Sequence, residues 1–384
     1  MKNVLIINQS AELYGADKVI LELIENFPKD YNPIVVLHEE GPLKELLEKK
    51  NIQVIKSSVI KVKRGILKPS FLLNLPFEIF SSIRNIQKQL NGQKISVIHS
   101  NATSVFIGAF YAFFFRIPHL WHVHEIIEKP KRIALVYPKV ISFFANRIVF
   151  NSMATEKHFT SIKPNISPKS ILIYNGQERT SQKTSFEKIK LIRQSITKDE
   201  KIIIGLVGRI SEIKGQDLMI KAFSVLLKKH KNIHLVFIGS TVLGKESFLK
   251  KINALINKES LQNHITFIDF KEDIWPYYDS IDISVVPSKE KESFGLVATE
   301  SMLSAKPVVA ANHGGLSEIV VHNHTGFLFE PNNIDDLAQK LDELIQSEEK
   351  RGIFGENGYL RVVEKFNTGK FIEGIKSEYD KLTK

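Results

Sequence analysis

Short apolar runs alternate with amphipathic stretches in the first part of the chain. An apolar run at residues 4–8 leads through a loop containing Gly15 into residues 17–27, where apolar positions recur at helical spacing. Further apolar runs of strand length follow at residues 33–38, 94–100, 118–124 and 146–152. Strands that alternate with helices in this way predict a doubly wound α/β fold with a parallel sheet.

The same pattern starts again about 200 residues later. Residues 201–210 have the pattern of a buried strand and residues 215–229 that of a helix, and further strand-like runs follow. A chain of 384 residues also exceeds the usual size of a single core. We therefore expect two Rossmann-like domains, at residues 1–185 and 186–368, with the polar residues 179–188 as linker. A C-terminal helix at about residues 369–384 is expected to pack back on the first domain.

The net charge of +11 lies entirely in the N-terminal half. Residues 1–185 contain 25 Lys and Arg against 14 Asp and Glu, whereas the rest contains 28 of each kind. Two clusters contribute most visibly: Lys61, Lys63, Arg64 and Lys68, and then Lys129, Lys131 and Arg132. They could attract an anionic membrane surface or an anionic acceptor, and a basic surface without a ligand is the alternative. Nucleic acid is not expected as a partner, because no nucleic-acid motif or aromatic stacking platform accompanies the charge.

Neither of the two apolar segments that could indicate export or membrane insertion is long enough to do so. The N-terminal apolar run is too short for a secretory signal, and the chain has no cysteine, which fits a reducing compartment. Residues 105–115 are strongly apolar but shorter than a bilayer-spanning helix. We expect a buried helix there, with a membrane-inserting helix as the alternative, and a cytoplasmic protein.

Two glutamates flank a predicted strand-to-helix turn in residues 289–302. Glu292 and Glu300 lie eight positions apart, on either side of Phe294, Gly295 and Leu296. Other glutamate pairs share that spacing, so the context carries the signal. A helix that begins near Gly295 presents backbone amides to a phosphate or a sugar hydroxyl, and carboxylates accept hydrogen bonds from hydroxyls. Surface glutamates around a helix cap are the alternative.

Two cations occupy a second loop, at residues 208–215. Arg209 and Lys214 follow a buried strand, and Gly208 and Gly215 allow the backbone to approach another group closely. Such cations can neutralise the charge on a departing diphosphate, which a metal ion would otherwise do. An exposed basic loop without a ligand is the alternative.

The order of three segments, GRISEIKG, PSKEKESFGLVATESM and ANHGGLSEIVVHNHTGFLFEP, resembles the donor half of glycosyltransferase family four. That family comprises retaining enzymes with the GT-B fold, in which two facing Rossmann-like domains with parallel sheets enclose an interdomain cleft. The resemblance implies that Arg209 and Lys214, beside Gly208, bind the donor diphosphate without a metal ion. It further implies that Glu292 binds the donor sugar and Glu300 the ribose, while the amides of Ser293, Phe294, Gly295 and Leu296 contact sugar and phosphate.

The N-terminal half resembles the family at shorter motifs. LYGADKV is similar to a Gly-Gly-Ala-Glu loop near the donor phosphate, which implies a role for Gly15 and Ala16, although Tyr14 and Asp17 depart from the pattern. The His124-Glu125 pair resembles a His-Asp element at the acceptor side, so that His124 would contact the donor sugar or orient the acceptor hydroxyl. His122, on the same strand face, is the competing choice.

The resemblance predicts a retaining glycosyltransferase that moves a sugar from a UDP-, GDP- or ADP-sugar to a saccharide or lipid-linked acceptor. Surface polysaccharide biosynthesis at the inner membrane face is the expected setting, with no cofactor. One alternative is a non-catalytic sugar-nucleotide-binding protein, and another is a sugar-nucleotide epimerase or phosphorylase on the same architecture. A nicotinamide-dependent oxidoreductase is disfavoured, because the first loop lacks the spaced glycines of a pyrophosphate fingerprint.

Overall fold

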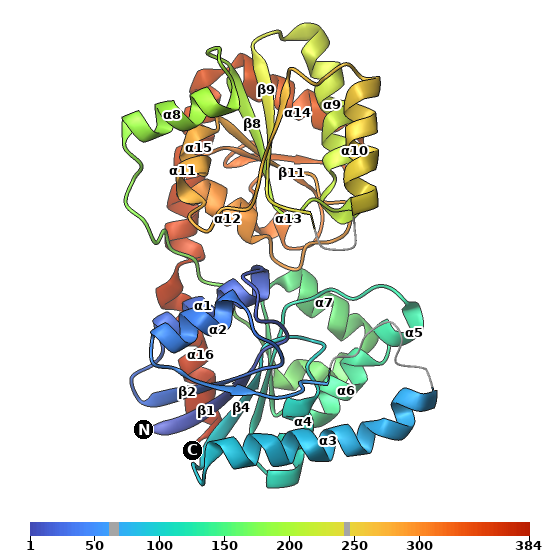
Figure 1. Cartoon of the computed structure of the whole chain (residues 1–384), viewed down its shortest axis with the longest axis vertical. Coiled ribbons are helices and arrows are strands. Elements are labelled where there is room, and N and C mark those ends of the chain that lie inside the picture. The colour runs from blue at the N-terminus through green and yellow to red at the C-terminus, as the bar shows by residue number, and fades with distance from the viewer. Residues whose placement is uncertain (61–68, 242–245) are drawn as a thin grey trace. The chain divides into compact units, whose positions relative to one another are not determined.

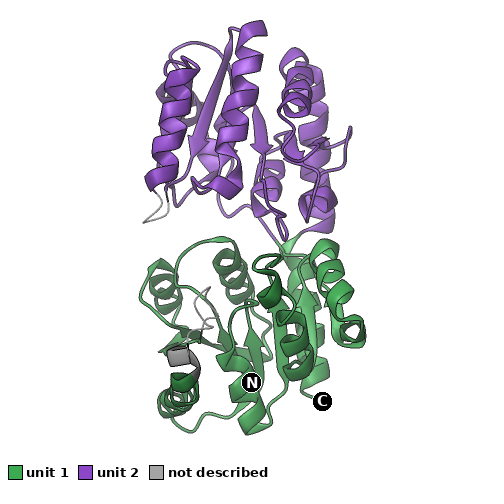
Figure 2. Cartoon of the chain, turned by 90° about the vertical axis from the view of Figure 1, so that its right-hand side faces the viewer, with its two compact units in different colours: residues 1–176, 367–384 green, residues 177–366 purple. Residues whose placement is uncertain are grey.

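A computed structural model describes residues 1–60, 69–241 and 246–384. The chain forms two compact units, Met1–Gly176 with Asn367–Lys384 (unit 1) and Gln177–Phe366 (unit 2), as Figure 2 shows. The sequence placed the boundary after residue 185, whereas the structure divides the chain after Gly176. The basic cluster formed by Lys61, Lys63, Arg64 and Lys68 lies outside the described residues.

Unit 1 is built on a seven-stranded sheet in the order β3-β2-β1-β4-β5-β6-β7, and every strand pair is parallel. The strands are β1 (Lys2–Ile7), β2 (Tyr31–Leu37), β3 (Gln53–Lys56), β4 (Ile95–Ser100), β5 (His119–Val123), β6 (Arg147–Phe150) and β7 (Ser170–Leu172). Each apolar run predicted as a strand in this half is therefore a strand, and the doubly wound α/β fold is confirmed.

Helices cover both faces of this sheet (Figure 1). They are α1 (Gly15–Glu25), α2 (Pro42–Lys49), α3 (Pro69–Leu90), α4 (Ile107–Phe115), α5 (Lys131–Ala134), α6 (Tyr137–Phe144), α7 (Met153–Ile162) and α16 (Thr368–Leu382), with a 3-10 turn η1 (Pro164–Lys169). Ile98 and Trp121, on one face, pack in cores shared with α3, α4 and α6. His99 and His122, on the other face, contact Tyr379 and Phe371 of α16.

Helix α4 is buried along only part of its surface, although its apolar sequence predicts a buried helix. Ile107 and Ala109 are buried, but Phe113 and Phe114 are each 62% exposed. A helix without polar positions has no polar face to mark its exposed side, so the pattern could not show this. Among the described residues no helix is both long and apolar enough to cross a bilayer.

The C-terminal helix α16 belongs to unit 1 through buried polar contacts. Glu378 is fully buried and forms ion pairs with Arg147 of β6 and Lys381. The hydroxyl of Tyr379 lies 2.6 Å from Nδ1 of His99. These contacts explain why the chain returns to its first unit after completing the second.

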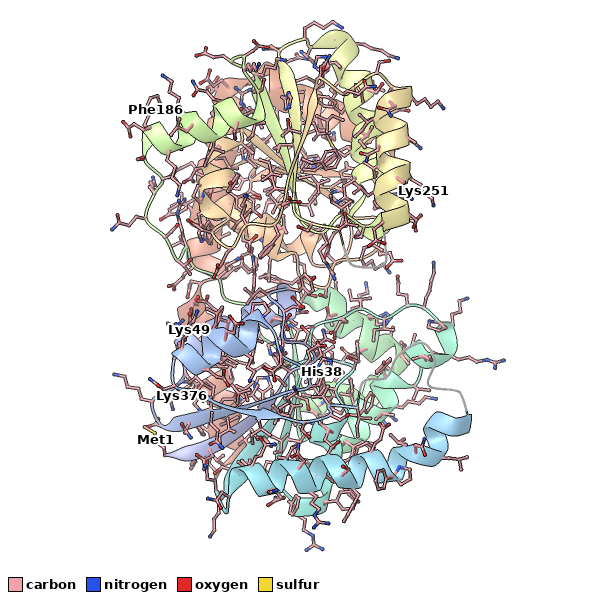
Figure 3. The ribbon with its side chains drawn as sticks, in the orientation of Figure 1. Met1, His38, Lys49, Phe186, Lys251 and Lys376 are labelled. Atoms are coloured by element: carbon pink, nitrogen blue, oxygen red, sulfur yellow. The ribbon has the colours of Figure 1, made fainter. Side chains whose placement is uncertain are left out.

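Unit 2 contains a six-stranded parallel sheet in the order β10-β9-β8-β11-β12-β13. The strands are β8 (Ile202–Val207), β9 (Ile233–Ile238), β10 (Ile265–Ile268), β11 (Ile283–Val286), β12 (Val308–Ala311) and β13 (Gly326–Phe329). The helices are α8 (Phe186–Ile196), α9 (Gln216–Lys229), α10 (Glu246–Lys258), α11 (Trp275–Ser280), α12 (Leu296–Leu303), α13 (Leu316–Ile319), α14 (Ile334–Gln346) and α15 (Glu348–Lys365), with a 3-10 turn η2 (Glu212–Lys214). Phe186 and Lys251 project from α8 and α10 at the outside of this unit (Figure 3).

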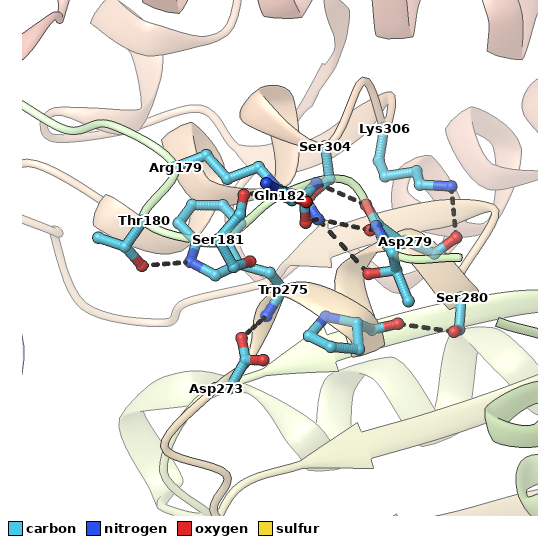
Figure 4. A network of polar contacts seen from close by, with 12 residues as sticks. Arg179, Thr180, Ser181, Gln182, Asp273, Trp275, Asp279, Ser280, Ser304 and Lys306 are labelled. Carbon is cyan, nitrogen blue, oxygen red and sulfur yellow. Dashed lines mark hydrogen bonds and ion pairs between the residues drawn. The ribbon is translucent and has the colours of Figure 1, made fainter. Parts of the chain in front are cut away.

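A network around Arg179 fixes the start of unit 2 (Figure 4). The Arg179 guanidinium donates to both carboxylate oxygens of Asp279, at 2.8 and 2.6 Å, and lies over the Trp275 ring. Burial alone would raise the pKa of Asp279, but hydrogen bonds from Arg179 and Thr184 hold it below its ordinary value. Lys306 donates to the Asp279 carbonyl at 2.9 Å. The predicted linker is therefore partly structured, which explains why the unit boundary falls before it.

Candidate functional site

The loop after β8 carries both predicted cations and is held against a neighbouring strand. Gly215 has a φ of +74°, and a Cβ there would lie 2.0 Å from the Pro287 carbonyl oxygen, so only glycine fits. Gln216 fixes the loop from within, since its side-chain amide donates to the Arg209 carbonyl at 2.9 Å. The loop from Gly208 to Gly215 thus lies at the carboxyl ends of β8 and β11, where ligands of such sheets bind.

Lys214 and Glu292 meet at this edge of the sheet. Their side chains pair at 2.5 Å and remain 19% and 21% exposed, and Ser288 donates to the same Glu292 oxygen at 2.6 Å. Burial raises the pKa of Glu292, but the charge and hydrogen bond of Lys214 outweigh it, and the net pKa is lowered. Glu292 is therefore ionised at neutral pH, and both side chains are partly exposed. A ligand hydroxyl could therefore replace Lys214 as the partner of Glu292, and a ligand anion could replace Glu292 as the partner of Lys214.

The loop after β12 packs directly on the Glu292 loop. A Cβ on Gly314 would lie 2.2 Å from the Glu292 carbonyl oxygen, and the Gly315 amide donates to that oxygen at 2.7 Å. Nε2 of His313 lies 2.8 Å from the Ser288 carbonyl, to which it donates. Loops from β8, β11 and β12 consequently converge on one point.

Helix α12 begins at that point, with Gly295 as its N-cap and no side-chain cap. The amides of its first turn and the helix dipole favour an anion there. Phe294 itself is buried and its ring packs on Phe366 at 5.7 Å, so only its backbone faces the turn. Ser293 precedes it and Leu296 opens the helix. The backbone of residues 293–296 thus forms the turn that the sequence predicted.

Glu300 lies inside α12 and is held by a partner that the sequence did not reveal. It is only 3% exposed and accepts a hydrogen bond of 2.8 Å from the hydroxyl of Tyr278 in α11. Burial and the nearby Glu300 charge raise the pKa of Tyr278 well above its ordinary value, so the phenol stays protonated and donates. Neither Glu292 nor Glu300 is an ordinary surface glutamate.

Unit 1 assembles its own polar cluster at the carboxyl ends of β1, β4 and β5. Asp17 is buried and accepts hydrogen bonds from Asn8 at 2.7 Å, Ser10 at 2.5 Å and the Tyr14 amide at 3.2 Å. Burial raises the pKa of Asp17. Asp17, where the chain departs from the family pattern, is thus a carboxylate that orders the first loop and the start of α1, beside Gly15.

Asn101 connects this loop to His124. The Asn101 amide nitrogen donates to Asn8 at 2.8 Å and to the Ala16 carbonyl at 3.2 Å, so its oxygen is the acceptor toward Nε2 of His124, 2.9 Å away. Nε2 therefore carries the proton and Nδ1 is left as an acceptor. Burial lowers the pKa of His124 to about 3, which keeps the ring neutral.

His122, the competing choice, lies deeper than His124 in unit 1. It is fully buried, its ring lies 3.9 Å from that of His124, and it also contacts Phe371. Glu125, the other half of the predicted pair, accepts from the Thr103 amide at 2.8 Å, and burial raises its pKa. Sequence reasoning missed Asn8, Asn101, Ser288 and His313, whose one signal was a polar residue at the end of a predicted strand or directly after it.

No group of three or more His, Asp or Glu side chains suited to a metal ion occurs in the described parts of the chain. Arg209 and Lys214 are the cationic side chains that the residues 208–215 loop brings to this site. Independence from a metal ion stays a prediction.

Comparison with known proteins matches both halves of the chain. Residues 187–361 match the model for glycosyl transferases group 1, and residues 14–178 match the model for glycosyltransferase family 4. An uncharacterized glycosyltransferase of Methanocaldococcus jannaschii is 29% identical over 88% of this chain and 87% of its own length. The capsular polysaccharide biosynthesis glycosyltransferase CapM of Staphylococcus aureus is 25% identical over 88% of this chain and 93% of its own.

Among solved structures, Anabaena HepE in complex with UDP-glucose superposes with a TM-score of 0.86 at 25% identity, covering 99% of this chain and 100% of that one. The two parallel sheets, the strand-end loops and both family matches agree. The chain is a glycosyltransferase of family four with the GT-B fold.

Proposed function

We propose that the chain transfers a sugar, with retention of anomeric configuration, from a nucleoside diphosphate sugar to a saccharide or lipid-linked acceptor. The observation that carries the proposal is the convergence of Lys214, Glu292 and the start of α12 at one edge of the unit 2 sheet. A fixed cation, an ionised carboxylate and a helix N-terminus together suit a ligand with a diphosphate at one end and hydroxyls at the other.

In this proposal unit 2 binds the donor. Arg209 and Lys214, next to Gly208, neutralise the diphosphate, and the amides of residues 293–296 contact sugar and phosphate. Glu292 accepts hydrogen bonds from the sugar hydroxyls once the diphosphate has drawn Lys214 away. Glu300, oriented by Tyr278, binds the ribose. A metal ion is not needed, because these cations supply the positive charge.

Unit 1 binds the acceptor in the same proposal. Gly15 and Ala16 approach the donor phosphate, and the unprotonated Nδ1 of His124 accepts a hydrogen bond from a sugar or acceptor hydroxyl. As the bond between the anomeric carbon and the phosphate oxygen breaks, a bond to the acceptor oxygen forms on the same face. The acceptor proton passes to the departing phosphate oxygen.

The proposed setting is the inner face of the cytoplasmic membrane, in surface polysaccharide biosynthesis. Two observations support it: the name of CapM refers to capsular polysaccharide, and the positive charge of this chain is concentrated in its N-terminal half. The structure of HepE with UDP-glucose makes a UDP-sugar the first donor to test, ahead of GDP- and ADP-sugars.

The test measures nucleoside diphosphate release from each sugar nucleotide, with a mixture of membrane lipids as acceptor source and a chelator present. We expect turnover with one donor class, and loss of most turnover in Arg209→Ala and in Glu292→Ala while both variants stay folded. Near-normal turnover in both would refute the site. Donor binding without any turnover would favour the non-catalytic alternative, and a changed free sugar nucleotide would favour an epimerase.

A further inference from the structure

Helices α3, α4 and α6 form one layer on a face of the unit 1 sheet, and α4 lies between the other two. The side chain of Gln87 in α3 donates to the hydroxyl of Tyr111 in α4. On the other side, Phe113 of α4 and Phe144 of α6 are in ring contact at 6.0 Å. Figure 1 shows α3 and α4 as neighbouring ribbons in this layer. Their outer surfaces are therefore parts of one surface.

Helix α3 is apolar on two faces along its middle. Its inner side chains, including Ile79 and Ile83, pack against the core of unit 1. Its outer positions Leu73, Phe77 and Phe80 follow helical spacing and are 80%, 74% and 65% exposed. Contiguous exposed apolar side chains on a folded protein commonly mark an interaction site. The outer stripe is thus not explained by the folding of unit 1.

Large aromatic side chains continue this stripe on the neighbouring helices. The last three residues of α4 are exposed phenylalanines, and Phe143 at the end of α6 is 72% exposed. The rings of Phe143 and Phe144 are in edge contact at 4.9 Å, which joins α6 to the α4 cluster. We call Phe77, Phe80, Phe113, Phe114, Phe115 and Phe143 the aromatic surface.

Exposed cations border the aromatic surface, and acidic residues are nearly missing from its helices. Arg84 and Lys88 continue the outer stripe of α3 at successive turns, and Arg116 directly follows the phenylalanines of α4. Glu78 is the one acidic residue in the sequence of α3, and the sequences of α4 and α6 contain none. The surface therefore combines aromatic rings with net positive charge.

We propose that the aromatic surface docks unit 1 on an anionic lipid bilayer. Aromatic side chains partition into the headgroup region, while adjacent Lys and Arg side chains pair with anionic lipids. A second copy of the chain is a poorer occupant, because a symmetric contact would bring Arg84, Lys88 and Arg116 near their own equivalents without acidic partners. In relation to the proposed function, which this inference deepens, docking would hold the enzyme where lipid-linked acceptors reside.

The first experiment measures cosedimentation of the full chain with vesicles of phosphatidylcholine alone or mixed with phosphatidylglycerol. We expect binding to the mixed vesicles that weakens at least tenfold in high salt. Phe113→Ser with Phe114→Ser should lower the partition coefficient at least tenfold at either salt concentration. The matched control is Phe186→Ser with Leu191→Ser on α8, where the side chains are similarly exposed. It should bind within twofold of the unchanged protein.

A second pair of variants tests the cations. Arg84→Glu with Lys88→Glu should lower binding to mixed vesicles at least tenfold at low salt. Lys221→Glu with Lys228→Glu, an equal charge change at exposed positions of α9, should have a much smaller effect. No vesicle binding by the unchanged protein, or equal binding by each variant and its control, would overturn the proposal.

Two further readouts separate the competing explanations. Circular dichroism and the thermal shift produced by UDP should be the same in every variant, because none touches the donor site. A missing UDP shift in all proteins would refute the proposed donor but leave the vesicle result intact. A Phe113 and Phe114 variant that converts a dimer to a monomer without changing vesicle binding would assign the surface to a second copy.

Discussion

Unit 1 should lose stability in mild acid, because it buries histidines that are neutral when folded. Burial lowers the pKa values of His99, His119 and His124 to about 3, and that of His122 well below its ordinary value. The unfolded chain, with histidine pKa values near 6.5, takes up protons that the folded unit excludes. Stability is therefore complete above about pH 6.5 and falls as the pH drops toward the folded pKa values.

The magnitude follows from these shifts. At pH 5 each of the three histidines with a pKa of about 3 destabilises the fold by about 2 kcal/mol, or about 6 kcal/mol together. Asp17 and Glu125 act in the opposite direction, since burial raises their pKa values and the folded unit binds their protons more readily. The histidine contribution alone is comparable with a typical domain's stability of about 5–15 kcal/mol, so we expect a measurable net loss.

Tryptophan fluorescence can follow each unit separately, because the chain has two tryptophans, Trp121 in unit 1 and Trp275 in unit 2. Urea unfolding of Trp275→Phe, which reports unit 1, is measured at pH 7.5 and pH 5. Trp121→Phe reports unit 2, where His234 with a pKa of about 4 should cost about 2 kcal/mol and His264, whose pKa burial also lowers, should add to that loss. His119→Gln should reduce the loss in unit 1 by about 2 kcal/mol. Equal stability of unit 1 at both pH values would refute the reasoning.

Three substitutions test other parts of the account. Lys214→Ala should lower kcat by about 10²- to 10³-fold, because it removes a fixed cation from the leaving group, and a loss below tenfold would contradict its role. Gly215→Ala should destabilise unit 2 in urea unfolding and weaken donor binding, because the added Cβ would meet a backbone oxygen. The control is Gly352→Ala, where a Cβ meets nothing within 4 Å, and it should be neutral or stabilising. Glu378→Gln should cost about 1.5–3 kcal/mol in unit 1, because it weakens the charge-assisted hydrogen bond between the buried Glu378 and the partly exposed Arg147, whereas the exposed Glu373→Gln should change stability by less than about 0.5 kcal/mol.

Much of the fold could be read from the sequence because parallel strands are buried on both faces. Their near-continuous apolar runs, such as residues 4–8 and 201–210, stand out against the amphipathic helices. The exposure of Phe113 and Phe114 could not be read, since an all-apolar helix gives no sign of which side faces outward. The predicted domain boundary falls later than the observed one because the sequence does not show that Arg179 contacts Asp279, 100 residues away, and so belongs to unit 2.

The candidate site was predictable where the residues lie within one loop. The glycines and cations of residues 208–215 are close in sequence and directly follow a buried strand, so the loop could be singled out as a candidate, and its phosphate-binding role stays a prediction. Ser288, Tyr278 and Asn101 were missed because each acts through a partner on another strand or helix. Each meets its partner only when the chain folds and brings segments that are distant in sequence together.

The central claim is that unit 2 offers fixed positive charge and helix amides to a nucleoside diphosphate. A crystal structure of the chain with UDP-glucose and a chelator tests it most directly. We predict phosphate oxygens within hydrogen-bonding distance of Lys214 Nζ and Arg209, with Glu292 turned to the sugar hydroxyls. Phosphates bound away from residues 208–215, or binding that requires a divalent cation between phosphate and protein, would contradict the account.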